Sequence, residues 1–183
     1  MQQSRITIGV FAFGEVPTVF LNVIAAHISG FLNIDSEILP SVVPPHYALH
    51  EQRIQYDCGI ILKAFNPETF DKYEKVIGVL TVDLFVPILT YVYGEARQGG
   101  KLALVSTFRL QKNPQGVSAP SSLVYERTAK VALHELGHLF NLTHCDDGKC
   151  LMHFSGSLKE LDRTPIYLCR YCTAYLRHAL QRQ

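Results

Sequence analysis

The stretch His134–Cys145, with the sequence HELGHLFNLTHC, limits what this chain can fold into more than any other feature. His134 and His138 are four positions apart in an apolar run, so on a helix both side chains lie on one face, one turn apart. Two imidazoles with this spacing can ligate one metal ion, and the carboxylate of Glu135 would lie beside it. The alternative is a buried helix whose histidines only pack or cap.

A third histidine, His144, can reach the same ion only if the chain bends after the helix, and Asn141 lies at this bend. Asn tolerates the left-handed conformation better than other non-Gly residues, so we predict a positive φ at Asn141. Three neutral imidazoles leave the fourth position of a tetrahedral zinc ion to water, as in catalytic sites. Zinc lowers the pKa of that water to about 7, so that Glu135 can act as a general base.

Four of the five cysteines follow a second metal-binding pattern, C-x4-C and then C-x2-C after a gap of 18 residues: Cys145, Cys150, Cys169 and Cys172. The pattern is typical of a structural zinc held by four thiolates, and the alternative is two disulfides. The first residues read as a strand without a signal peptide, which indicates a cytoplasmic, reducing location and favours zinc. Cys145 directly follows His144, so a thiolate site would also fix the third histidine. Cys58 is expected to be a small buried apolar residue.

The whole pattern, HExxHxxGxxHC followed by C-x-M and a distant C-x2-C, resembles the signature of the archaemetzincins, a family of metzincin-clan zinc metallopeptidases. Asn141, in place of Gly, is the one departure from it. The segments Gln55–Asp57 and Asp83–Ala96 are also similar to the family. The resemblance implies one catalytic and one structural zinc. It also implies that Met152 forms an apolar floor beneath the histidines, whereas the sequence alone suggests an ordinary core methionine.

With 183 residues, 48% of them hydrophobic and 18% charged, the chain fits a single domain of the α+β class. We expect a twisted mixed sheet with packed helices, of the zincin or metzincin type that the resemblance implies. Residues 1–141 would form the sheet and the active-site helix. Residues 142–183 would form a small irregular subdomain held by the four-cysteine zinc.

Hydrophobic periodicity and the positions of Pro and Gly predict the individual elements. The expected strands are Arg5–Phe13, Ile38–Val43, Lys75–Asp83 and Leu102–Leu110. The expected helices are Pro17–Leu32, a long helix capped by Ser121 or Ser122 and ending near Phe140, and Cys169–Leu180, with a possible further helix in Tyr56–Phe65.

The segment Thr90–Ala96 is expected at the edge of the sheet, where it would border a cleft whose floor is the active-site helix. An exposed edge of this kind can pair with an extended peptide, although an ordinary solvent-facing edge is the alternative. The polar residues Asp83, Glu95 and Arg109 would lie near this cleft, and structural pairing is the role that we expect for each.

Charge and hydropathy restrict the partners. The chain has 17 Lys and Arg against 16 Asp and Glu, a net charge of +1, and no basic tract, which argues against a zinc ribbon that binds nucleic acid. No apolar run is long enough to span a membrane. We therefore expect a monomeric zinc peptidase that acts on peptides or proteins. The competing hypothesis is a non-catalytic zinc protein whose cleft binds a peptide or protein partner.

Overall fold

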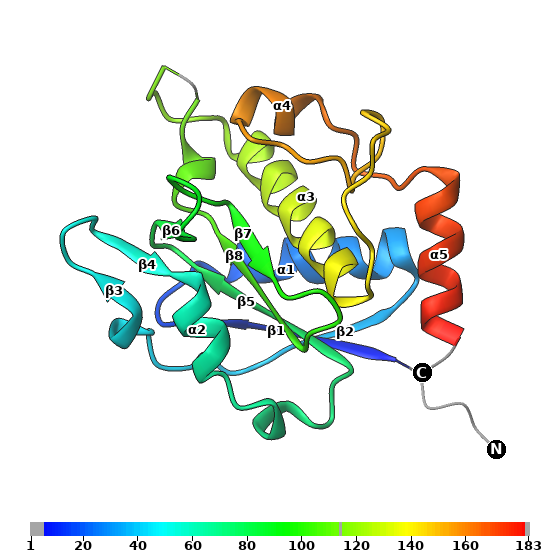
Figure 1. Cartoon of the computed structure of the whole chain (residues 1–183), viewed down its shortest axis with the longest axis horizontal. Coiled ribbons are helices and arrows are strands. Elements are labelled where there is room, and N and C mark those ends of the chain that lie inside the picture. Colours follow the sequence, from blue (N-terminus) through cyan, green and yellow to red (C-terminus); the bar gives the residue numbers. More distant parts are fainter. Residues whose placement is uncertain (1–5, 114, 182–183) are drawn as a thin grey trace.

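The computed structural model describes residues 6–113 and 115–181, and a five-stranded mixed sheet forms its centre (Figure 1). The strand order is β2-β1-β5-β8-β7, and only β7 runs antiparallel to its neighbour. The strands are β1 Thr7–Ala12, β2 Asp35–Ile38, β5 Lys75–Leu80, β7 Gly94–Ala96 and β8 Leu102–Ser106. This arrangement confirms the expected mixed sheet, and it also confirms that the segment ending at Ala96 forms an edge.

Helices cover one face of this sheet and a small second sheet lies on the other. Helices α1 (Thr18–His27) and α3 (Ser121–Leu139) share a core with alternate residues of the strands, including Val10, Ala103 and Val105. The opposite face packs against α2 (Cys58–Ala64) and the small sheet. The strands of that small sheet are β3 Leu49–His50, β4 Gln55–Asp57 and β6 Leu84–Phe85, in the order β3-β4-β6. Successive side chains of β5 point alternately into the two cores on opposite faces of the sheet, so this strand is buried along its whole length.

Several of the expected local features differ from the structure. The strand expected at Leu102–Leu110 ends at Ser106, and a 3-10 turn, Arg109–Gln111, follows it; the strand expected at Lys75–Asp83 ends at Leu80.

The second strand is Asp35–Ile38, not Ile38–Val43, and beyond it Val42 forms an isolated bridge with Phe13, the residue after β1. The register shifts by one residue across Pro40 and Ser41, because the N–H of Leu39 donates to Val10 and the next donor to the strand residues is Val42, which donates to Ala12.

The long helix begins at Ser121 without a side-chain cap, because Pro120 occupies the cap position with φ −57° and ψ 142°. The serines therefore lie inside the first turn and do not cap it. The end of the helix agrees with the expectation, since α3 ends at Leu139 and Phe140 follows as its cap.

The region that follows α3 is mostly irregular and contains two short helices, α4 Leu158–Arg163 and α5 Arg170–Gln181. An ion pair between a buried arginine and a partly exposed aspartate joins this region to α3. Arg127 is only 1% exposed and donates to both carboxylate oxygens of Asp162, at 2.6 and 2.8 Å. It also donates to the carbonyl oxygens of Leu110 and Lys112. Each of the three guanidinium nitrogens thus donates to an acceptor, which burial of a charge requires.

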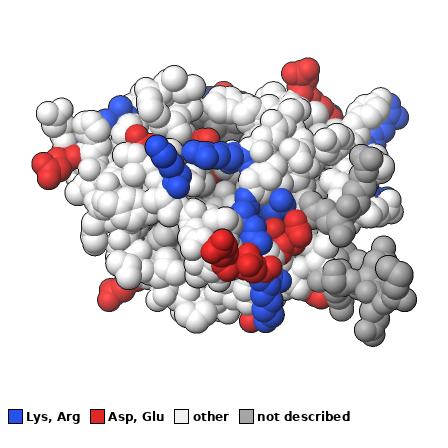
Figure 2. Space-filling model, turned by 60° about the horizontal axis from the view of Figure 1, so that its bottom comes forward, with Lys and Arg blue, Asp and Glu red and all other residues white. Residues whose placement is uncertain are grey.

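The surface and the helices add two findings on possible partners. On the face seen in Figure 2, the described basic and acidic residues lie side by side on a largely uncharged surface and form no broad basic area. Among the described residues, no helix combines the length and the apolar character needed to cross a membrane.

Candidate metal centres

The three histidines of the motif come together in the structure. His134 and His138 project from the last turns of α3, and His144 returns from the loop beyond the helix. One ring nitrogen from each lies within 4.8 Å of the others. The ring centroids are 4.8 to 5.3 Å apart, and the Nε2 atoms of His134 and His138 are separated by 3.1 Å. The sequence spacing therefore produces a convergent cluster.

Backbone carbonyl groups determine which nitrogen each of the first two histidines presents. The Nδ1 of His134 lies 2.8 Å from the carbonyl oxygen of Leu151, and the Nδ1 of His138 lies 2.7 Å from that of Leu142. A carbonyl oxygen only accepts, so each Nδ1 carries the proton and each Nε2 presents a lone pair. Two lone pairs 3.1 Å apart cannot hydrogen-bond to each other. A cation between them satisfies both, so the residues fit a metal ion.

The environment also favours the neutral imidazoles that bind metals. Burial lowers the pKa of His134 to about 4, and burial also lowers the pKa values of His138 and His144. Neutral histidine is the ligating form. The cluster is therefore ready to bind a divalent ion at neutral pH.

The helix ends in a Schellman motif that turns the chain back toward the cluster. Asn141 has φ 66°, as its sequence position predicts. Its N–H donates to the carbonyl of His138, and the N–H of Leu142 donates to that of Gly137, each at 3.0 Å. The N–H of Gly99 also donates to the His138 carbonyl, at 2.9 Å. The turn beyond β7 thus donates a hydrogen bond to a carbonyl group at the C-terminal end of the active-site helix.

Glu135 lies under the edge strand. It is 8% exposed, and burial together with the nearby charge of Glu95 raises its pKa well above the usual range. A Cβ placed on Gly94 would lie 2.7 Å from Cγ of Glu135 and 2.8 Å from the carbonyl oxygen of Leu104. The absence of a side chain at Gly94 therefore lets β7 lie directly on the glutamate. Our sequence analysis missed this role, although an isolated Gly in a strand is a signal of close approach.

The three polar residues expected near the cleft behave differently. Asp83 and Arg109 form a bidentate ion pair with two contacts of 2.6 Å, as expected for structural pairing. Glu95 forms no salt bridge within the described part of the chain, so the expected pairing is wrong for this residue. It lies opposite Leu104 in the ladder, and burial raises its pKa.

A cavity of about 900 Å³ adjoins the histidines. Residues 86–96 of the sheet edge line one side, residues 154–156 line the other, and α3 contributes Glu135 and the two helical histidines. Tyr91 approaches the opposite wall, with its hydroxyl 3.5 Å from the carbonyl oxygen of Gly156. The cleft thus lies between the sheet edge and the C-terminal region, as the sequence predicts.

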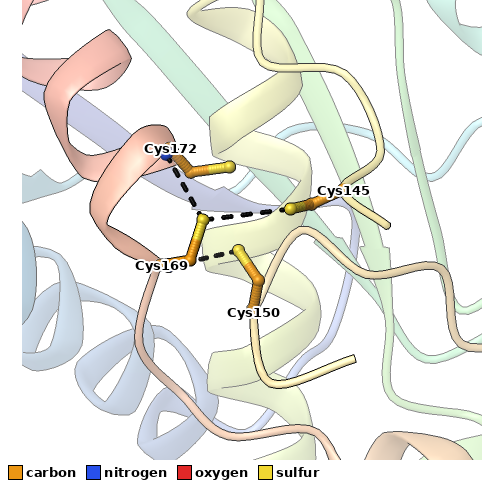
Figure 3. Close-up of side chains that lie close together, drawn as sticks. All are labelled: Cys145, Cys150, Cys169 and Cys172. Atoms are coloured by element: carbon orange, nitrogen blue, oxygen red, sulfur yellow. Dashed lines mark hydrogen bonds between the residues drawn. The ribbon is translucent and has the colours of Figure 1, made fainter. Parts of the chain in front are cut away.

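The four cysteines of the second pattern also converge (Figure 3). Their sulfur atoms lie within 4.8 Å of one another, all are free thiols, and the contact between Cys145 and Cys169 is 3.9 Å. The backbone N–H of Cys172 donates a hydrogen bond to the sulfur of Cys169, and this bond is the main reason why the pKa of Cys169 is lowered to about 7. The convergence of all four sulfur atoms on one point is compatible with a four-thiolate metal site. Cys58 is fully buried on α2, as expected.

Met152 is fully buried against the active-site helix. A Cβ on Gly137, between the two helical histidines in sequence, would lie 2.5 Å from the Met152 sulfur. This contact agrees with a floor beneath the histidines. Gly137 was also missed in the sequence analysis, although Gly inside a helix costs about 1 kcal/mol relative to Ala and therefore indicates a packing requirement.

The mixed sheet, the helix with its HExxH residues, the positive φ at Asn141 and the returning third histidine together define a zinc metallopeptidase of the metzincin type.

Comparison with known proteins identifies the family. The model of peptidase family M54 matches residues 46–178. The archaemetzincin of Methanopyrus kandleri is 38% identical over 138 residues, which is 75% of each chain. That of Pyrococcus furiosus is 35% identical over 179 residues, 94% of this chain and 93% of the relative. The chain therefore belongs to peptidase family M54, the archaemetzincins.

Solved structures agree with this assignment. The crystal structure of the M. kandleri archaemetzincin has a TM-score of 0.83 at 33% identity, covering 99% of this chain and 98% of that one. The archaemetzincin of Archaeoglobus fulgidus, crystallised with malonate, has a TM-score of 0.81 at 30% identity, with coverages of 93% and 99%. Metalloproteinase-II of Bacteroides fragilis, at 14% identity and a TM-score of 0.55, shares the fold alone, covering 97% of this chain and 53% of that one.

Proposed function

We propose that this zinc metallopeptidase hydrolyses peptide bonds with Glu135 as the general base and with His134, His138 and His144 as ligands of the catalytic zinc. A second, structural zinc would be held by Cys145, Cys150, Cys169 and Cys172, with Met152 and Asn141 as structural support for the histidine site. The observation that carries the proposal is the pair of Nε2 lone pairs that face each other at 3.1 Å, each fixed by an Nδ1–H bond to a carbonyl. A metal ion bound between them satisfies both at once.

When bound to three imidazoles, zinc supplies Lewis acidity, which acidifies water and polarises the scissile carbonyl. The remaining step belongs to Glu135, whose carboxylate takes a proton from the attacking water and passes it to the leaving amine nitrogen.

The edge strand β7 would position the substrate. An extended peptide that pairs with the outer edge of β7 lies in the cavity, directly over Glu135, because Gly94 leaves no side chain between strand and glutamate. Backbone pairing holds the peptide regardless of its sequence, while side chains of the substrate contact the cavity walls. The substrate class is therefore an extended peptide or an unfolded segment of a protein.

The test is the variant Glu135→Ala, purified without added metal or chelator. We expect the same zinc content as the wild type and complete loss of cleavage of a peptide library, because the ligands stay and the proton acceptor is lost. Glu15→Ala is the matched control, since Glu15 is an exposed carboxylate outside the cavity. Cleavage by Glu135→Ala near the wild-type rate would refute the role of this residue. Tight peptide binding by zinc-loaded wild type without any cleavage would instead favour a binding cleft.

A further inference from the structure

The four residues Cys150–His153, here called the strap, contact both metal centres. Cys150 belongs to the thiolate cluster. The carbonyl oxygen of the next residue, Leu151, accepts the Nδ1–H of His134 at 2.8 Å. Met152 packs against the active-site helix at Gly137. A short piece of backbone therefore reaches from a ligand of one site to the orienting group of the other.

The last residue of the strap, His153, holds Cys145. Its Nδ1 lies 2.9 Å from the carbonyl oxygen of Cys145, so this nitrogen carries the proton and donates. The N–H of Cys145 donates in turn to the carbonyl oxygen of Met152 at 2.9 Å. Both backbone polar groups of Cys145 are thus bound by the strap. Cys145 is itself a member of the thiolate cluster and directly follows His144 in the chain.

His144 depends on this arrangement more than the other two histidines do. His134 and His138 lie on a helix, and each has an Nδ1–H bond to a carbonyl. Within the described residues His144 has no such side-chain bond, and its ring contacts Phe154 at a centroid distance of 5.3 Å. It is exposed and lies in a loop. Its position is therefore set mainly by the backbone of Cys145.

We propose that His153 is a positioning residue that couples the two metal centres, so that zinc at either centre raises the affinity of the other for zinc. The inference rests on the proposed function, because it requires that both clusters bind zinc. His153 does not line the cavity, and it acts through Cys145 on His144. A thiolate site that holds Cys145 in place presents His144 to the histidine site, and zinc on His144 restrains Cys145 for the thiolate site.

The first test compares two substitutions of His153. His153→Phe keeps a ring of similar size but removes the donor, whereas the side-chain amide of His153→Asn can place its nitrogen close to the position of Nδ1. Loss of a hydrogen bond that supports a metal ligand typically weakens metal affinity about 10- to 100-fold. In His153→Phe we expect the zinc affinity of the histidine site, measured by chelator competition, to fall at least about 10-fold. In His153→Asn we expect this affinity to stay near the wild-type value.

The control is His178→Phe, which replaces an exposed histidine of α5. It should change the zinc affinity of neither the histidine site nor the cysteine site. Unchanged zinc affinity of the histidine site in a folded His153→Phe protein would overturn the proposal. Equal weakening in the Phe and Asn variants would overturn it as well, because the donor would then not be the cause.

A second measurement needs no change at His153. Cobalt(II) bound to thiolates absorbs through sulfur-to-metal charge transfer, so its release from the cysteine site can be followed directly. Coupling between two binding equilibria is reciprocal. If metal at the thiolate site raises the metal affinity of the histidine site by some factor, metal at the histidine site must raise the metal affinity of the thiolate site by the same factor. We expect the thiolate site of His138→Ala to bind cobalt about 10-fold more weakly than that of the fully loaded wild type, as measured by chelator competition at equilibrium.

The outcomes separate the two proposals. A wild-type protein that binds one metal ion, at the cysteines only, would refute the proposed function and the coupling with it. Two metal ions with affinities that do not depend on each other would refute the coupling alone and leave the proposed function in place.

Discussion

The histidine and cysteine clusters lie close together in sequence but are built differently. Two of the three histidines are on one rigid helix, and carbonyl oxygens of Leu142 and Leu151 orient their rings. The cysteines come from an irregular loop and from the start of α5, and the chain between them contains only the six-residue helix α4. The helix therefore orders two of the three histidines before metal binds, whereas we expect a bound metal ion to contribute much of the order of the cysteine site.

The largest expected effect tests this difference on the cysteine side. Cys172→Ser should destabilise the protein by about 4 kcal/mol when zinc is present at about 1,000 times its dissociation constant, because binding then adds that amount to the folded state. Urea unfolding measures it, and hydrogen exchange should show lost protection in residues 142–181 while α3 stays protected. His138→Ala, which should lose the zinc of the proposed histidine site, serves as the comparison. An equal or greater loss of protection of residues 142–181 in that variant would contradict the distinction.

A second prediction concerns the metal-free histidine site. Burial holds the pKa of His134 at about 4, whereas an unfolded histidine titrates near 6.5. Below pH 6.5 the unfolded chain therefore binds more protons than the folded one, and stability falls as the pH drops from about 6.5 to about 4. This separation corresponds to roughly 3 kcal/mol.

Urea unfolding of the metal-free protein at pH 7 and pH 4.5 measures this effect, with His134→Asn as the matched variant. The difference in pH dependence between the two proteins isolates the buried imidazole from other titrating groups. Identical pH dependence in the two proteins would mean that the fold does not keep the imidazole of His134 neutral.

The third prediction tests the contact between the sheet edge and the glutamate. Gly94→Ala introduces a Cβ 2.7 Å from Cγ of Glu135 and 2.8 Å from a backbone oxygen, so strand and side chain must move apart. Displacement of reacting groups by about 1 Å can cost roughly 100-fold in rate. We expect a loss of that order in peptide cleavage with unchanged zinc content. Gly148→Ala, where an added Cβ meets no atom within 4 Å, should keep full activity. Wild-type activity of Gly94→Ala would show that the close approach is not needed.

The smallest effect is expected at the turn that returns the chain to His144. Asn141→Ala should cost about 1 kcal/mol, because Ala is unfavourable at φ 66°. Asn141→Gly, which restores the residue typical of the family, should be close to neutral. Thermal unfolding of both variants in the presence of zinc checks this order. An Ala variant as stable as the Gly variant would mean that another contact holds the turn.

Much of the site was predictable because its signals are local. The spacing of His134 and His138, the bend at Asn141 and the spacing of the cysteines lie within a few residues, and helix geometry converts them into positions. The buried strand β5 and the end of α3 were predictable for the same reason. The errors were also local in origin, since the register shifts across Pro40 and Ser41 beyond the second strand and Pro120 takes the cap position that we assigned to a serine.

The sequence by itself determined the types of ligand, their grouping into two sets and the class of fold. The tertiary structure alone decided that Leu151 orients His134, that Gly94 lies on Glu135, that Gly137 accommodates Met152 and that His153 holds Cys145. The first three of these contacts join residues 15 or more positions apart, and the contact of His153 with Cys145 crosses an irregular loop. No helical or strand periodicity relates such residues, so their contact depends on how the elements pack and cannot be read from spacing along the chain.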